Sequence, residues 1–443
     1  MKEDRMKIQI LHLDRPGDAQ EVERLLKKLR LDPVDLALLR GERAQQTASV
    51  QAMLADVANR GDEALVEISR KFDDPNFTAD QIRVKPEEMR EGAARISKEQ
   101  TAALKRSIAQ VREYQSHVMP KDPAPLRRPG VELGMRFLPL DSAGLYFPGG
   151  KAAYPSSLIM LAVPAQVAGV NKVVVCTPPS KYGRSDLVLA ACHELKLEYV
   201  FRAGGAAAIG AMAFGTKSIP AVDKIVGPGN AYVQLAKRLL AGCVGIDAFL
   251  GPSEIVVLAD ETGDAKFIAS DLLAQAEHDP GSCFLLTTSE KLSRDVASEL
   301  EEQTAALSRK AAIEKSLAND SAIIVDPSMD RLIDLSNRFA AEHVNLQVRE
   351  EKSVLAKLTS AGAVFVGPYS PVAAGDYIAG PSHCLPTNTT ARFSSGISVY
   401  EFLKRSSVAR YEKQGLANDA SCIIELANAE HLDAHAASVK SRI

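Results

Sequence analysis

Short β-branched and apolar runs alternate with helical stretches over much of this chain. The first series of runs lies at 172–177, 199–201 and 223–226, and the second lies at 254–258, 283–287, 322–325 and 363–366. Helical patterns separate the runs of the second series, at 264–278, 289–307, 328–340 and 350–360. This alternation is typical of parallel β-α-β units. The sequence therefore predicts an α/β protein with two tandem Rossmann-like domains.

The length of 443 residues exceeds one ordinary hydrophobic core and favours several domains. We predict an N-terminal helical segment at 1–40 and a discontinuous first Rossmann-like domain at 41–143 and 253–397, which carries the polar site residues. The second Rossmann-like domain, on the nucleotide side, is expected at 144–252, and a C-terminal helical segment at 398–443. The C-terminal segment either folds back to a site or reaches another subunit.

Charge and cysteine usage exclude several classes of function. The 53 Lys and Arg against 56 Asp and Glu give a net charge of -3, which offers no basic field for nucleic acid. The N-terminus lacks a signal-type apolar block, and Pro164 interrupts the most apolar stretch, so neither export nor a membrane span is expected. Six cysteines without a C-x-x-C pair indicate reduced thiols in a cytoplasmic protein.

Three glycine clusters follow apolar runs and precede helical ones, at 148–150, 202–205 and 227–230. Such turns place free backbone N–H groups at a helix N-terminus, where a phosphate group can bind. None of them has the G-x-G-x-x-G spacing of a dinucleotide fingerprint. The clusters therefore favour either a nucleotide site or tight β-α turns.

A polar cluster is predicted around Gln275 and His278, because residues three apart share one face of a helix. Asp376 and a C-terminal histidine would add the oxygen and nitrogen ligands that zinc accepts. A glutamine ligand is unusual, and a helix-surface amide is the simpler interpretation of Gln275 alone. Asp376 lies in a loop where a carboxylate either binds metal or caps a turn.

The pair Glu342-His343 precedes the apolar alternation 344–348 and is expected at the start of a strand. An imidazole can move a hydroxyl proton while a neighbouring carboxylate activates water. The alternative is a helix-end glutamate followed by a histidine that the helix dipole favours. The residues alone leave both interpretations open.

Several motifs together resemble the histidinol dehydrogenase family, in register from about residue 45 to residue 440. They are GLYFPGG at 144–150, VDKIVGPGN at 222–230, GPSE at 251–254, SDLLAQAEH at 270–278, AEH at 341–343 and AGDYIAGPSH at 374–383. The family is a homodimeric zinc enzyme that oxidises L-histidinol through the aldehyde to L-histidine with two NAD, at the last step of histidine biosynthesis. The resemblance thus implies a small-molecule substrate, one zinc ion per subunit, NAD, and a homodimer with shared active sites.

The resemblance also implies roles for individual residues. Glu342 and His343 match the catalytic pair, and Tyr146 and Asn230 match contacts to NAD. The zinc ligands would be Gln275, His278, Asp376 and His435, with His435 contributed by the partner subunit. The same four residues and His343 also match substrate positions, together with Ser253, His383 and Glu430.

Two residues depart from the family pattern. Ala207 stands where the family usually has a glutamine near the nicotinamide, and Val372 stands where it usually has a glutamate near the substrate. Loss of a charge-assisted hydrogen bond costs roughly 1.5–3 kcal/mol. Two alternatives follow: a related enzyme acting on another alcohol such as sulfopropanediol, and a zinc- or nucleotide-binding scaffold without turnover.

Overall fold

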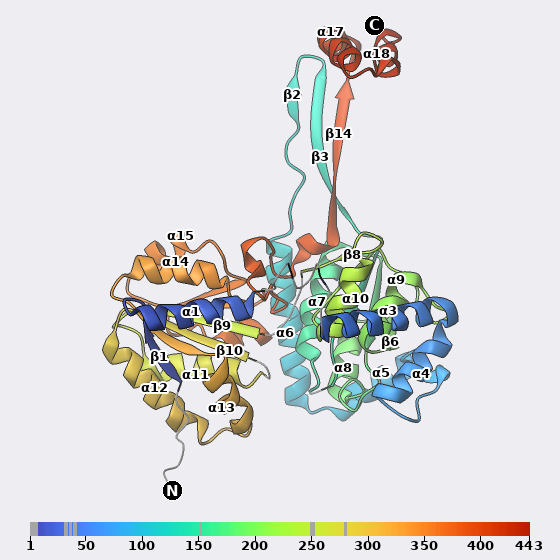
Figure 1. Cartoon of the computed structure of the whole chain (residues 1–443). Helices are drawn as coiled ribbons and strands as arrows, with labels where there is room; N and C mark the ends of the chain where they lie inside the picture. The colour runs from blue at the N-terminus through green and yellow to red at the C-terminus, as the bar shows by residue number, and fades with distance from the viewer. Residues whose placement is uncertain are drawn as a thin grey trace.

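The computed structural model describes residues 8–30, 42–150, 152–248, 253–278 and 281–443, together with Val34 and Leu38. Two α/β units stand side by side, and a long antiparallel arm rises from between them (Figure 1). The predicted α/β class with parallel sheets is confirmed. Parts of the N-terminal segment predicted at 1–40 lie outside the described residues.

The first unit is built on a six-stranded sheet in the order β1-β11-β10-β9-β12-β13, with every neighbouring pair parallel. Its strands are β1 Gln9–His12, β9 Ser253–Ala259, β10 Gly281–Thr287, β11 Ala322–Val325, β12 His343–Gln347 and β13 Ala363–Val366. Successive residues of β9 enter different cores, because strand side chains alternate between faces. Both faces of this sheet are therefore buried.

Helices cover the two faces of this sheet. One core holds α11 Ala265–Ala276, α12 Glu290–Thr304 and α13 Lys310–Asn319, and the other holds α1 Pro16–Leu29, α14 Met329–Phe339 and α15 Glu351–Lys357. A short helix, α16 Val372–Tyr377, follows β13. Strand β1 pairs with β11, so the described part of the N-terminal segment completes this sheet and is not purely helical.

The second unit has a five-stranded parallel sheet in the order β6-β5-β4-β7-β8. Its strands are β4 Ser142–Tyr146, β5 Lys172–Thr177, β6 Tyr199–Arg202, β7 Lys224–Val226 and β8 Gly245–Ile246. Four helices share a core with one face: α5 Pro86–Arg95, α6 Lys98–His117, α7 Pro155–Ala168 and α8 Asp186–Glu194. The other face packs on α3 Glu42–Arg60, α4 Asp62–Phe72, α9 Gly205–Phe214 and α10 Ala231–Leu240.

This packing differs from the predicted grouping of 41–143 with 253–397. Helices α3 to α6 bury their apolar residues against the five-stranded sheet; Leu54 and Val57, for example, share a core with Phe201 and Ile209. A helix that precedes both sheets in sequence can cover either one, and periodicity does not say which. The described helices of 42–117 thus belong with 144–248.

The arm is a three-stranded antiparallel sheet that ends in two helices (Figure 1). Its elements are β2 Leu126–Arg128, β3 Val131–Pro139, β14 Leu403–Tyr411, α17 Lys413–Ala429 and α18 Asp433–Lys440. The prediction that 398–443 is helical was therefore wrong for β14, which pairs with β3 along nine residues. Short 3-10 turns lie elsewhere, at Ala79–Gln81, Thr390–Arg392 and Val399–Phe402.

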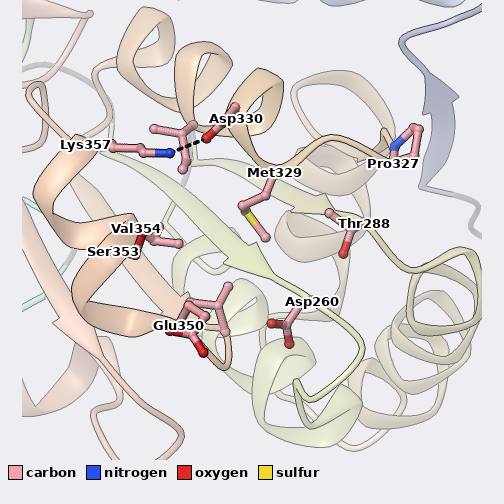
Figure 2. A pocket seen from close by; sticks show the side chains of 11 residues that line it. Asp260, Thr288, Pro327, Met329, Asp330, Glu350, Ser353, Val354 and Lys357 are labelled. Atoms are coloured by element: carbon pink, nitrogen blue, oxygen red, sulfur yellow. Dashed lines mark hydrogen bonds and ion pairs between the residues drawn. The ribbon is translucent and has the colours of Figure 1, made fainter.

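A cavity of about 330 Å³ lies where the strands of the six-stranded sheet end (Figure 2). Asp260 follows β9, Thr288 follows β10 and Val348 follows β12, so these lining residues mark the carboxyl edge. Across the part of the chain that the structure describes, no helix has both the length and the apolar character needed to cross a bilayer. All six cysteines are free thiols in the described chain.

Candidate active site

The predicted catalytic residues lie at the opposite, amino edge of the six-stranded sheet. Ser253 opens β9 and His343 opens β12, and these strands are parallel neighbours. Helix α11 leads from the carboxyl end of β9 back to the amino end of β10, so its last turn reaches the same edge. That turn carries Gln275, and the backbone N–H of His278 donates to the Gln275 carbonyl at 3.2 Å.

Gln275 and His343 meet at this edge although 68 residues separate them. The Gln275 Oε1 atom lies 3.2 Å from His343 Nδ1, and the two residues are only 3% and 5% exposed. An amide oxygen only accepts, so where His343 donates to Gln275 the imidazole proton is on Nδ1 and Nε2 carries the lone pair. Burial lowers the pKa of His343 to about 4, which keeps the ring neutral.

Glu342 lies directly beside this imidazole, with its Oε2 atom 3.7 Å from His343 Nδ1. The same oxygen accepts hydrogen bonds from the Ser253 hydroxyl and, at 3.3 Å, from the Glu254 backbone N–H. Burial raises the pKa of Glu342 well above its usual value, although the Ser253 hydroxyl opposes the shift. A buried carboxyl group of this kind holds its proton strongly and accepts one readily.

Glu254 is a second buried carboxyl group at this edge, and the sequence analysis gave it no role. Its Oε1 atom accepts from the Asn388 backbone N–H at 2.9 Å, while its Oε2 atom is buried without a hydrogen-bond partner. Burial raises the pKa of Glu254 to about 8. Its position in the GPSE motif beside Ser253 was the available sequence signal.

The segment 376–383 contributes Asp376 and His383 to the site. His383 Nδ1 lies 2.8 Å from the Asp376 carbonyl oxygen and 4.0 Å from the Asp376 carboxylate. Its Nε2 atom lies 3.0 Å from the hydroxyl of Ser157, which belongs to the first turn of α7 in the other unit. Ser157 could not be predicted from the sequence, because nothing local links residues 226 positions apart.

Helix α6 of the five-stranded unit also holds this segment. The Ser107 hydroxyl donates to the Tyr377 carbonyl at 2.6 Å, and the Gln115 side-chain amide donates to the Gly380 carbonyl at 3.4 Å. Gln115 is fully buried, and its Oε1 atom accepts from the Val399 backbone N–H. The residues that present Asp376 and His383 are therefore fixed by both units.

The donor set at this edge fits a zinc ion. Gln275 offers an amide oxygen, and its Nε2 atom is buried without a partner. Burial lowers the pKa of His278, so its imidazole keeps a free lone pair, and the Asp376 carboxylate acts on the same ring. Among the described residues of this single chain, no three His, Cys, Asp or Glu side chains could hold a metal ion together. Gln275, His278 and Asp376 include only two residues of those four types.

The glycine clusters lie at the carboxyl edge of the five-stranded sheet, after β4, β6 and β7. Tyr146 ends β4 and is buried, and its hydroxyl oxygen accepts from the Gly205 backbone N–H at 3.1 Å. Asn230 is exposed and caps α10, because its Oδ1 atom accepts from the N–H groups of Tyr232 and Val233 at 3.1 Å. The two residues thus flank the central strands β4 and β7, where the direction of strand addition reverses.

Glu430 and His435 are not brought to this cluster within the chain. Both are exposed, Glu430 at the end of α17 and His435 in α18. These helices form the tip of the arm, away from both sheets (Figure 1).

The two departures from the family pattern lie in apolar cores. Val372 is 4% exposed and packs in the core of the six-stranded unit, while its backbone N–H donates to Asp271 at 3.4 Å. Ala207 is buried in α9 within a core of the five-stranded unit. Neither side chain faces open space at the polar cluster.

Comparison with known proteins decides the family. The family model for histidinol dehydrogenase matches residues 39–443. The chain belongs to the histidinol dehydrogenase family. It is 44% identical over 414 residues to "Histidinol dehydrogenase" of Gluconobacter oxydans, covering 93% of this chain and 96% of that one. It is 42% identical over 394 residues to the Rhodopirellula baltica protein of the same name, covering 89% and 86%.

A solved structure agrees with this family assignment. The crystal structure of histidinol dehydrogenase from Elizabethkingia anophelis superposes with a TM-score of 0.91 at 34% identity, covering 99% of this chain and 98% of that chain. The resemblance in the sequence is therefore confirmed, and the chain is an oxidoreductase of the histidinol dehydrogenase type.

Proposed function

We propose that this protein oxidises L-histidinol through the aldehyde to L-histidine, using one zinc ion per subunit and two NAD, at the last step of histidine biosynthesis. The observation that carries the proposal is the buried contact of His343 with Gln275 and Glu342 at one sheet edge. Here a neutral imidazole, a carboxyl group and an amide oxygen that can bind metal lie together. Family membership supports the same reaction.

Gln275, His278 and Asp376 would hold the zinc ion, with Tyr146 and Asn230 on the NAD side. When bound, zinc would supply a template that orients the substrate through its imidazole and amino nitrogens, and NAD would supply the hydride acceptor. Ser253 contacts Glu342, and His383 contacts Ser157; both Ser253 and His383 would orient the substrate. Ser253 donates to Glu342, which leaves its hydroxyl oxygen free to accept a substrate hydrogen bond.

His343 is the base for the alcohol. Its Nε2 atom takes the hydroxyl proton, while the contact of Nδ1 with Gln275 Oε1 fixes the ring and its tautomer. Glu342 serves the second half of the reaction, in which its carboxylate takes a proton from the water that adds to the aldehyde. Because burial raises its pKa, this carboxylate is a stronger base than an exposed one.

Completion of the site by a second subunit follows from the arm. His435 would be the fourth zinc ligand and Glu430 a substrate contact, each supplied by the partner subunit of a homodimer. Their exposure at the tip of the arm supports this arrangement. The arm strand β14 is exposed from Lys404 to Tyr411 and so is free to contact a second chain.

Purified protein with zinc, NAD and L-histidinol tests the reaction. Two NADH formed per histidinol consumed support the proposal, and NADH formed only with sulfopropanediol or a similar alcohol supports a related enzyme. Bound zinc without reduction of NAD by any alcohol supports a scaffold.

A further inference from the structure

One ion pair in the five-stranded unit is fully buried. Lys237, on α10, pairs with Asp247, which follows β8, and neither side chain has any exposed surface. Burying two charges is costly unless other groups satisfy their remaining hydrogen bonds. The groups that hydrogen-bond to Lys237 and Asp247 therefore indicate what the pair holds in place.

Both partners bind the backbone of the same residue, Gly227. The Lys237 ammonium donates to the Gly227 carbonyl at 3.0 Å, and the Gly227 N–H donates to Asp247 Oδ2 at 2.6 Å. Gly227 has a φ of +122°, and a Cβ atom there would lie 1.9 Å from the Tyr146 carbonyl oxygen. The backbone N–H and the carbonyl of Gly227 are thus both hydrogen-bonded to the ion pair, and its Cα packs closely against the last residue of β4.

Gly227 begins the loop 227–230, which leads from β7 into α10. The Gln234 side-chain amide donates to the Gly229 carbonyl at 3.4 Å, and Asn230 caps the helix. Tyr146 and Asn230, the two residues proposed to contact NAD, therefore lie on either side of the clamped glycine. A shift of Gly227 would move Asn230 relative to Tyr146.

We propose that Lys237 and Asp247 are positioning residues for NAD: their buried ion pair clamps Gly227 and so preforms the loop 227–230 beside Tyr146. This inference rests on the proposed use of NAD. Neither side chain of the pair has exposed surface, so the pair can act on NAD only through the loop. Preorganised loops lower the conformational cost of binding.

The decisive variant removes both charges together, as Lys237→Met with Asp247→Leu. Replacing a buried ion pair by apolar residues is often neutral for folding, so a purely structural pair could be exchanged without functional loss. We expect the KM for NAD to rise at least about tenfold, as preorganisation is lost, with kcat at saturating NAD within about threefold and zinc content unchanged. A wild-type KM for NAD would overturn the proposal.

Lys224→Met is the matched control. Lys224 lies on β7 and pairs with Glu401 at 2.6 Å, and its charge acts on Asp247. If charge near Asp247 mattered without contact with Gly227, this variant would raise the KM for NAD as much as the double variant, and the clamp would be wrong. We expect a change below about twofold.

Amide hydrogen exchange tests the clamp without NAD. In the full-length protein, exchange in residues 224–234 should become at least about tenfold faster in the double variant, while residues 172–177 of β5 stay protected. If the double variant does not fold, Lys237→Arg takes its place, because a guanidinium keeps the charge but not the ammonium geometry at Gly227. Unchanged exchange would overturn the inference even if NAD is used. Faster exchange in a protein that never reduces NAD would instead defeat the proposed function.

Discussion

The two parallel sheets repeat one strand order but use opposite edges. The two orders are β6-β5-β4-β7-β8 and β11-β10-β9-β12-β13. In each, the strand that comes first in the sequence, β4 or β9, is central. The next two strands are added on one side of it and the last two on the other side. The five-stranded sheet places its glycine turns at its carboxyl edge, whereas the six-stranded sheet places Ser253 and His343 at its amino edge. The same topology therefore does not determine where the chemistry lies.

The helices that follow strands in both units begin at the carboxyl edge and end at the amino edge, so the two proposed sites lie at opposite helix ends. Helices α9 and α10 begin at the glycine edge, so their N-termini favour anions such as the phosphates of NAD. Helix α11 ends at the catalytic edge, so its C-terminus favours a cation beside Gln275. The hydrogen bond between Ser157 and His383 joins the two edges. Each unit thus contributes the dipole end that suits its proposed ligand.

The largest effect is expected from the catalytic pair. His343→Asn should lower kcat for histidinol about 10²–10⁴-fold, because the base for the hydroxyl proton is lost. Glu342→Gln should spare aldehyde formation more than aldehyde oxidation. Rates of NADH formation from histidinol and from the aldehyde separate the two steps. Equal and small effects of both variants would contradict the assignment of catalysis to this edge.

Glu254 gives a pH dependence of stability. Burial raises its folded pKa to about 8, above the ordinary value of 4.5. Its protonated form therefore stabilises the folded state below about pH 4.5, and this stabilisation is lost as the pH rises towards 8. This difference of about 3.5 pKa units corresponds to roughly 5 kcal/mol.

The variant Glu254→Gln should flatten this slope, because glutamine keeps the shape but does not ionise. The measurement is the free energy of unfolding by urea at several pH values between 5 and 8, compared with the wild type. Glu302→Gln, an exposed position, is the control and should keep the wild-type slope. A Glu254→Gln protein with the wild-type slope would show that Glu254 does not titrate in this range.

Most strands of both sheets could be predicted because each is a short buried apolar run, as in β10 and β11. Strands β1, β4 and β8 were not predicted. The arm could not be predicted, since β14 reads LKRSSVARY and is exposed over nearly its whole length, with no apolar face to reveal a period of two. The spacing of Gln275 and His278 predicted one shared helix face, but α11 ends at Ala276, so His278 lies just beyond the helix. The contact of Ser157 with His383 could not be predicted, because it depends on how two units meet.

The next prediction tests whether a single subunit is enough to form the proposed zinc site. His435→Ala should lower zinc content, because one of four proposed ligands is lost. Mixing this variant with His278→Ala in equal amounts should restore about a quarter of the sites: half of the dimers are mixed, and one of their two sites is intact. The measurement is zinc content and activity of the refolded mixture. No recovery would mean that His435 acts within its own chain.

The smallest effect is expected at the carboxyl edge of the six-stranded sheet, and it sharpens the contrast between edges. Lys357 and Asp330 line the cavity there and pair at 2.6 Å, with 53% and 72% of their side chains exposed (Figure 2). Lys357→Ala should cost less than about 1 kcal/mol of stability, as exposed ion pairs contribute little. Turnover should stay within about twofold of the wild type, because the proposed reacting groups lie at the other end of β9 and β12. Steady-state kinetics of Lys357→Ala and of Gln275→Ala, each compared with the wild type, check this. A tenfold loss in Lys357→Ala would mean that both edges of this sheet serve the reaction, and the contrast between the two edges would fail.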